Sequence, residues 1–117
     1  FKVKNVKTQP KFLNFVKKSK NKSTKLFWHG SRNENWLSIL ETGLVLRPNA
    51  VVTGKMFGHG VYFADKFQKS LNYSSLSGSY WSGGSSDTGY LALFHVHTGK
   101  QYRIKNEYFF KYTFITN

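Results

Sequence analysis

Acidic residues are so few in this sequence that each can be considered as a candidate for acid–base or charge-stabilising chemistry: there are five among 117 residues. Glu34 and Glu41 fall on the polar side of an expected helix, and Asp65 falls where a carboxylate can cap the start of another. Asp87 lies in a Ser- and Gly-rich segment and is expected to be solvated. Glu107 opens an expected strand and is the candidate for chemistry; an ordinary exposed strand-end carboxylate is the alternative.

The histidines favour a binding role over a metal site. His95 and His97 are two apart on one expected strand, which suits metal ligands, but no third ligand follows at a fitting spacing, so no metal is expected. His29 ends an apolar strand directly before a Gly-Ser-Arg turn, where polar side chains and free backbone amides often line a cleft edge. A hydrogen-bonded core histidine is the alternative. The sequence has no cysteine, no nucleophile elbow, no Walker A loop and no Gly-x-Gly-x-x-Gly motif.

Short strands have to position these residues. Strands are expected at residues 1–7, 26–29, 61–64, 90–97, 101–104 and 107–115. The fifth is expected to return beside the fourth through a turn at Thr98 and Gly99, and Pro10 is expected to interrupt the first strand. Residues 12–16 fit a strand or a helical turn equally, residues 17–25 indicate a basic loop, and residues 44–60 and 74–89 indicate long loops.

Two helices are expected, at residues 33–42 and 66–75. The first has its apolar side chains at helical spacing, Ser31 or Asn33 available to cap its start, and Gly43 at its end. Asp65 is expected to cap the second. The pattern alone indicates a strand-rich α+β domain.

The charge is strongly basic and unevenly distributed. Lys and Arg number 18, the net charge is +13, and residues 1–25 carry nine lysines and no acid. Such a segment attracts polyanions, so contact with nucleic acid is one interpretation. A solvated lysine-rich surface or a biased coding composition is the other. No run of 18 apolar residues occurs, so no membrane span is expected.

Several segments, taken together, resemble the catalytic domain of the poly(ADP-ribose) polymerases, in the diphtheria-toxin-like branch of the ADP-ribosyltransferases. These are Leu26 to Arg32, Gly54 to Asp65 and Lys69 to Tyr73, with Asn106-Glu107-Tyr108 similar to the family's last motif. The resemblance implies an NAD-dependent enzyme that cleaves the nicotinamide–ribose bond and transfers ADP-ribose to a protein or nucleic-acid acceptor. No metal is implied, because nicotinamide leaves as a neutral ring.

The resemblance also implies a fold and a domain organisation. The fold is α+β, with two packed, mostly antiparallel sheets, an NAD cleft between them and two short flanking helices. We expect residues 1–117 to form a single minimal catalytic domain, in which residues 1–25 are a basic strand and loop and no helical regulatory domain is present.

The family's His-Tyr-Glu signature falls on His29, Tyr62 and Glu107, which the resemblance implies are the catalytic residues. Glu107 is then the carboxylate that stabilises an oxocarbenium-like transition state. His29 is implied to bind the adenosine ribose, the Gly30 backbone and Ser70 hydroxyl the nicotinamide carboxamide, and Tyr62 and Tyr73 the nicotinamide ring. Further NAD-binding residues implied are Ser31, Asn35, Arg47, Phe63, Ala64 and Lys69.

The chain departs from the family's pattern before Glu107, where about ten residues replace a much longer insertion found in chain-elongating members. This favours transfer of one or few ADP-ribose units, whereas the presence of Glu107 favours a polymer. Two other functions stay open: an NAD glycohydrolase, and a basic module that binds nucleic acid or ADP-ribose with weak or no catalysis. NAD dependence and the absence of cysteine favour an intracellular protein, nuclear or cytoplasmic.

Overall fold

The computed structural model describes residues 1–45, 60–76, 86–101, 103–106 and 109–114. Its helices are α1 (Gln9–Lys18), α2 (Asn33–Thr42) and α3 (Phe67–Leu71). Its strands are β1 (Thr24–Gly30), β2 (Val61–Tyr62), β3 (Leu91–His97), β4 (Arg103–Asn106) and β5 (Phe109–Phe114). The expected α+β class is confirmed, with three helices in the described residues where two were expected. None of these helices is long and apolar enough to cross a membrane.

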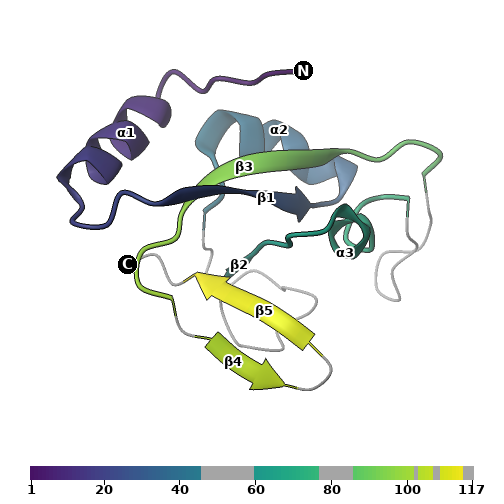
Figure 1. Ribbon diagram of the computed structural model, residues 1–117. Coiled ribbons are helices and arrows are strands. Elements are labelled where there is room, and N and C mark those ends of the chain that lie inside the picture. The colour runs from purple at the N-terminus through teal and green to yellow at the C-terminus, as the bar shows by residue number, and fades with distance from the viewer. Residues whose placement is uncertain (46–59, 77–85, 102, 107–108, 115–117) are drawn as a thin grey trace.

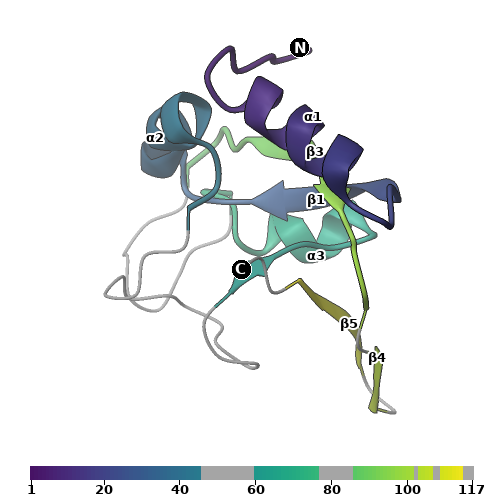
Figure 2. The same ribbon diagram turned by 90° about the vertical axis from the view of Figure 1, so that its left-hand side faces the viewer.

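The antiparallel pair β1–β3 lies at the centre of the molecule, with Thr24 opposite His97 and Gly30 opposite Leu91. A second, antiparallel group of strands has the order β2-β5-β4. Helices α1 and α2 lie on one side of the β1–β3 pair, and β4 and β5 lie on the other (Figures 1 and 2). The end of β1 at Gly30 is therefore reached by α2, which follows it directly, and by α3 beside it.

The core forms on one face of the β1–β3 pair. Phe27 and Phe94 are directly opposite each other in the register, so they share this face, and Phe27 is buried together with Val96. Phe63 packs against both phenylalanines, with ring centroids 6.5 Å from Phe27 and 6.0 Å from Phe94. Two backbone hydrogen bonds between Trp28 and Ala64, of 2.8 and 2.9 Å, fix the segment after β2 along the other edge of β1.

The N-terminal segment folds differently from the prediction. Residues 1–7 form coil and a turn where a strand was expected, and α1 then takes in the undecided residues 12–16. Phe1 and Val3, the apolar residues of the alternation that suggested a strand, are both exposed, so this pattern buries neither of them. Pro10 lies in the first turn of α1, where a backbone N–H would have no partner within the helix, so the missing N–H of proline costs no hydrogen bond. Pro10 thus lies at the start of a helix, whereas it was expected to interrupt a strand.

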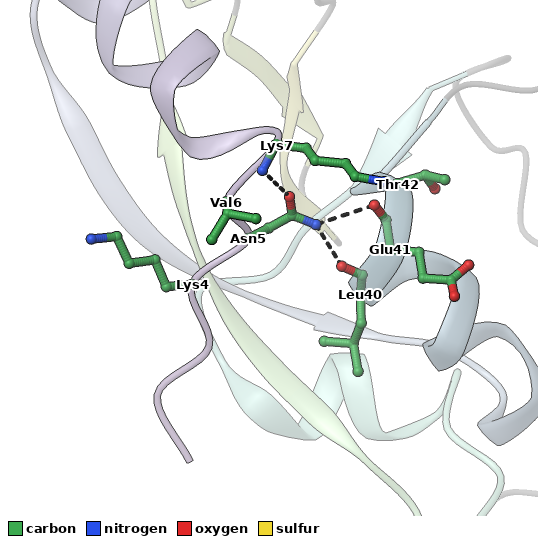
Figure 3. A pocket seen from close by; sticks show the side chains of 7 residues that line it. All are labelled: Lys4, Asn5, Val6, Lys7, Leu40, Glu41 and Thr42. Carbon is green, nitrogen blue, oxygen red and sulfur yellow. Dashed lines mark hydrogen bonds between the residues drawn. The ribbon is translucent and has the colours of Figure 1, made fainter.

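Asn5 connects the beginning of α1 to the end of α2 (Figure 3). Its Oδ1 accepts hydrogen bonds from the backbone N–H groups of Lys7 and Thr8, each at 2.9 Å. Its Nδ2 donates to the carbonyls of Leu40 at 2.6 Å and Glu41 at 3.2 Å, which have no helical partner in the last turn of α2. One side chain thus organises the turn into α1 and caps α2, beside a surface hollow of about 510 Å³.

Helix α2 has the predicted bounds and the predicted end. Gly43 has φ +79°, which favours glycine, and its N–H donates to the Ile39 carbonyl at 2.8 Å. The predicted cap at its start is wrong, because the N-cap residue is Arg32, where Ser31 or Asn33 was expected, and the Arg32 side chain makes no capping bond. The predicted capping by Asp65 is wrong as well, since Lys66 precedes α3 and makes no capping bond through its side chain.

Two elements are placed differently from the prediction. Helix α3 ends at Leu71, short of the expected residue 75, because the Ser74 hydroxyl bonds the Leu71 carbonyl at 2.7 Å and the following N–H groups form tighter turns. The expected return strand is β4, and it pairs with β5 where pairing with β3 was expected. After β3 the chain is held at Gly99 by the Asn21 amide, at 3.1 Å, and leads to the other group of strands.

Candidate functional site

His29 lies near the end of β1 in an aromatic environment. Its Nδ1 is 2.9 Å from the Tyr62 carbonyl oxygen. A carbonyl can only accept a hydrogen bond, so Nδ1 carries the proton, and Nε2 of the neutral ring is a hydrogen-bond acceptor. The rings of Phe63, Phe94 and Trp36 surround the imidazole, with centroids 5.7, 5.9 and 6.3 Å away. The fold therefore sets both the tautomer and the orientation of His29.

Burial lowers the pKa of His29 below its usual 6.5, and the hydrogen bond to the Tyr62 carbonyl opposes this shift in part. The ring is therefore neutral at pH 7. In that form it can accept a hydrogen bond from a ligand hydroxyl through Nε2.

The lowered pKa of His29 predicts that the free energy of unfolding decreases as the pH falls below about 6.5. In that range the unfolded chain takes up a proton at His29 before the folded chain does, so acid favours unfolding. Above the pKa of His29 in the unfolded chain, its contribution to the free energy of unfolding no longer changes with pH. Urea unfolding between pH 5 and 8 measures this pH dependence, because ordinary carboxyl groups titrate below that range.

A His29→Asn variant should lose this pH dependence, because its Nδ2 can still donate to the Tyr62 carbonyl while the side chain does not titrate. The matched control is His95→Asn, at an exposed position of β3. If the pH dependence persisted in His29→Asn and vanished in His95→Asn, its assignment to His29 would be wrong.

Gly30 brings β1 against the backbone of α3. A Cβ placed on Gly30 would lie 1.9 Å from the carbonyl oxygen of Ser70 and 2.8 Å from its carbonyl carbon. Only glycine allows such an approach. Ser70 is itself buried. The two residues that the resemblance assigns to the nicotinamide carboxamide are thus neighbours in the structure.

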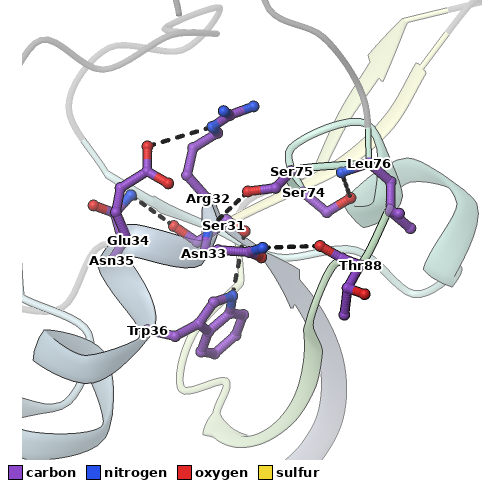
Figure 4. A network of polar contacts seen from close by, with 10 residues as sticks. All are labelled: Ser31, Arg32, Asn33, Glu34, Asn35, Trp36, Ser74, Ser75, Leu76 and Thr88. Atoms are coloured by element: carbon purple, nitrogen blue, oxygen red, sulfur yellow. Dashed lines mark hydrogen bonds and ion pairs between the residues drawn. The ribbon is translucent and has the colours of Figure 1, made fainter. Parts of the chain in front are cut away.

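The residues that lead into α2 and form its first turn make a network of polar contacts (Figure 4). Asn35 Nδ2 donates to the Ser31 hydroxyl at 3.0 Å, and the Trp36 indole N–H donates to the Ser31 carbonyl at 3.2 Å. Arg32 and Glu34 form an exposed ion pair at 3.5 Å. Ser31 and Asn35, both expected on the adenosine side of NAD, are therefore in direct contact.

The remaining predicted site residues are placed as follows. Phe63 packs against the His29 ring, and Ala64 is buried beside Trp28. Lys69 lies in α3. Tyr73 follows this helix: its backbone N–H donates to the Ser70 carbonyl at 3.1 Å, and the residue is 40% exposed. Tyr62 ends β2 and is half-buried. Arg47 and Glu107 lie outside the described residues.

Sequence reasoning assigned neither Asn33 nor Ser75 to this site. The backbone N–H of Asn33 donates to the Ser75 hydroxyl at 2.7 Å, and its Nδ2 donates to the Thr88 carbonyl at 2.8 Å. Ser75 is one of many serines in its segment, and nothing in the local pattern distinguishes it. Among the described residues no group of three or more potential metal ligands occurs. The His97 ring, once a candidate ligand, bonds the Asn21 carbonyl and packs against Phe15.

Comparison with known proteins identifies a matching family and several similar proteins. Residues 1–113 match the family model described as the poly(ADP-ribose) polymerase catalytic domain. The chain is 49% identical to poly [ADP-ribose] polymerase 2 of Arabidopsis thaliana over 86 residues, which are 73% of this chain and 13% of that protein. It is 46% identical to poly [ADP-ribose] polymerase 2 of Homo sapiens over 76 residues, 64% of this chain and 12% of that protein.

The chain covers a larger share of a viral relative than of the plant and human proteins. The putative poly [ADP-ribose] polymerase-like 100L of Invertebrate iridescent virus 6 is 35% identical over 102 residues, 86% of this chain and 51% of that protein. The chain thus spans about half the length of the viral relative and about an eighth of the plant and human ones.

Proposed function

The chain belongs to the poly(ADP-ribose) polymerase catalytic-domain family, as the resemblance in its sequence predicted, and we propose from this that it is an NAD-dependent ADP-ribosyltransferase. The reaction cleaves the bond between nicotinamide and ribose and transfers ADP-ribose to a protein or nucleic-acid acceptor. The observation that best supports it is the close approach of Gly30 to the backbone of the buried Ser70, because it brings together the two residues that would bind the planar carboxamide.

The proposed roles follow from the chemistry of the donor. The Gly30 backbone and the Ser70 hydroxyl hold the carboxamide of nicotinamide, while Tyr62 and Tyr73 stack on its ring. His29 accepts a hydrogen bond from an adenosine ribose hydroxyl through Nε2, an assignment that its neutral state supports. Further residues of the NAD site in this proposal are Ser31, Asn35, Arg47, Phe63, Ala64 and Lys69.

In the proposed reaction, the bond between the nicotinamide nitrogen and ribose C1′ breaks, and its electron pair stays with nicotinamide, which leaves as a neutral ring. Positive charge develops on the ribose, and the Glu107 carboxylate stabilises it. An oxygen of the acceptor then bonds to C1′ and gives up its proton. The short segment between β3 and Glu107 favours one or few transferred units.

Incubation of the purified chain with NAD labelled in its ADP-ribose part, with and without RNA or DNA, tests this function. Release of nicotinamide with label on protein or nucleic acid is the expected result, and the length of the attached product separates single units from polymer. Nicotinamide release without label on a macromolecule would identify a glycohydrolase instead. NAD binding without release would favour a binding module.

A second candidate function, binding of nucleic acid, is favoured by the lysines of residues 1–25. All nine side chains are exposed, and none forms an ion pair with a carboxylate of the described residues. Five of them, at positions 17, 18, 20, 22 and 25, lie from the last turn of α1 to the first residues of β1. Gly30 lies at the other end of this strand, roughly 20 Å away at about 3.3 Å per residue. A polyanion there need not compete with NAD.

Replacing Lys17, Lys18, Lys20 and Lys22 together by Gln is expected to weaken RNA or DNA binding by about tenfold or more. The dependence of log affinity on log salt should also become shallower, by up to about one unit for each phosphate that the variant no longer neutralises. The KM for NAD should stay within about twofold. Fluorescence anisotropy at several salt concentrations measures the binding. An unchanged salt dependence would exclude this surface as the nucleic-acid contact.

A further inference from the structure

The start of α2 obtains its cap from a distant part of the chain. The first N–H groups of a helix have no partner within it, and a side chain at the N-cap position usually supplies one. At α2 that position is Arg32, which makes no such bond. The Ser75 hydroxyl accepts from the Asn33 N–H at 2.7 Å instead, and Ser75 is only 2% exposed.

A second contact holds the same residue from another direction (Figure 4). Asn33 Nδ2 donates to the Thr88 carbonyl at 2.8 Å, and the Ser86 N–H donates to the Ser75 carbonyl at 2.7 Å. Asn33 Oδ1 is buried and has no partner among the described residues, so the Asn33 side chain is held through its Nδ2. The start of α2 is therefore fixed by the chain on both sides of residues 77–85.

Asn33 stands between Ser31 and Asn35, whose side chains bond each other at 3.0 Å. Resting on the proposed function, we propose that Ser75 is a positioning residue for the adenosine side of the NAD site. By capping α2 at Asn33, its hydroxyl keeps Ser31 and Asn35 in the geometry that receives the adenosine ribose. It touches neither the donor nor the reacting atoms in this proposal.

The proposal predicts an effect on one half of the donor only. Without the Ser75 hydroxyl, the first turn of α2 loses a capping bond and frays. The carboxamide contacts come from Gly30 in β1 and Ser70 in α3, which do not depend on that turn. Affinity for the ADP-ribose part of NAD should fall, whereas affinity for nicotinamide should not.

The experiment compares Ser75→Ala with Ser74→Ala. Ser74 is a suitable control because it is 1% exposed, and within the described part of the chain its hydroxyl bonds only Leu71 and Leu76, close by in sequence. Inhibition of the unaltered chain and of both variants is measured with ADP-ribose and with nicotinamide, alongside thermal unfolding. We expect Ser75→Ala to weaken ADP-ribose binding and raise the KM for NAD by about five- to tenfold, the size of one helix cap. Nicotinamide inhibition and kcat should change less than about twofold.

Ser74→Ala should leave the inhibition constants, KM and kcat within about twofold of those of the unaltered chain. We expect this even if its unfolding temperature falls as much as that of Ser75→Ala. Ser75→Thr, which keeps the hydroxyl, should bind ADP-ribose like the unaltered chain and serves as the second variant. Equal weakening of both ligands by Ser75→Ala, or of neither, would overturn the role of Ser75 while the proposed function stands. If the unaltered chain bound neither ligand, the proposed function would be overturned, and the role of Ser75 with it.

Discussion

A Glu107→Gln variant is expected to bind NAD with nearly unchanged affinity and to transfer ADP-ribose roughly 100- to 1,000-fold more slowly. Glutamine keeps the shape and the hydrogen-bonding oxygen of the side chain but removes the negative charge. In the proposed mechanism that charge is needed only when the ribose becomes positive, so its loss raises the barrier without changing ground-state binding. Single-turnover release of nicotinamide, together with NAD titration, measures the two quantities separately.

Glu41→Gln is the matched control for this change. Glu41 is an exposed carboxylate at the end of α2, and its role in the fold uses its backbone carbonyl, which accepts from Asn5. Its replacement should leave transfer unchanged. Transfer by Glu107→Gln at a near-normal rate would contradict the assigned role and favour a reaction without a stabilising carboxylate.

A Gly30→Ala variant is expected to lose measurable NAD binding and to unfold more easily by about 3 kcal/mol or more. The added methyl group would lie 1.9 Å from the Ser70 carbonyl oxygen. Both atoms are fixed to backbone, so no side-chain rotation can relieve the overlap. Strand β1 and helix α3 must separate, which removes the site that the two residues form together. Chemical denaturation and nicotinamide titration test the two effects.

Gly60→Ala provides the comparison at a permissive position. Of the residues that the structure describes, a Cβ there would meet only the Tyr62 Cε2 atom, at 4.0 Å, which is an ordinary contact. Stability and nicotinamide binding should therefore stay close to those of the unaltered chain. If Gly30→Ala behaved in the same way, the close approach of β1 to α3 would not be a requirement of the site.

The elements predicted well are those whose signals are local. Helix α2 combines apolar side chains at helical spacing with Gly43, and its observed bounds, Asn33–Thr42, agree with the prediction. The apolar runs that became β1 and β3 likewise bury Phe27 and Val96. In each case the residues that form the element also determine what it packs against, so the sequence pattern is sufficient.

Prediction failed where the deciding partner is distant in sequence. Residues 1–7 alternate like a strand, yet Asn5 bonds the end of α2, and the chain turns into a helix. The pairing of β4 with β5 and the cap that Ser75 gives to α2 depend in the same way on contacts between separate segments. A pattern confined to neighbouring residues cannot contain such information.

In the candidate site, too, the sequence indicates which residues take part, but the contacts between them depend on segments that are distant in sequence. The resemblance supplied its residues, and the contacts of His29, Gly30 and Ser31 describe how the folded chain holds part of them. The lowered pKa of His29 arises from rings of α2, β3 and the segment after β2 that only the fold brings together. No feature of the sequence around His29 alone predicts it.

The separation of the lysines from the donor residues along β1 also gives the domain an electric dipole. Its positive pole lies where β1 begins, among residues 17–25, whereas near the other end of β1 the charges of Arg32 and Glu34 offset each other in an ion pair. In the electric field of a polyanion, the domain rotates until its positive pole faces the polyanion. In the proposed function, the residues assigned to NAD would then face away from the polyanion, toward the solution from which NAD arrives.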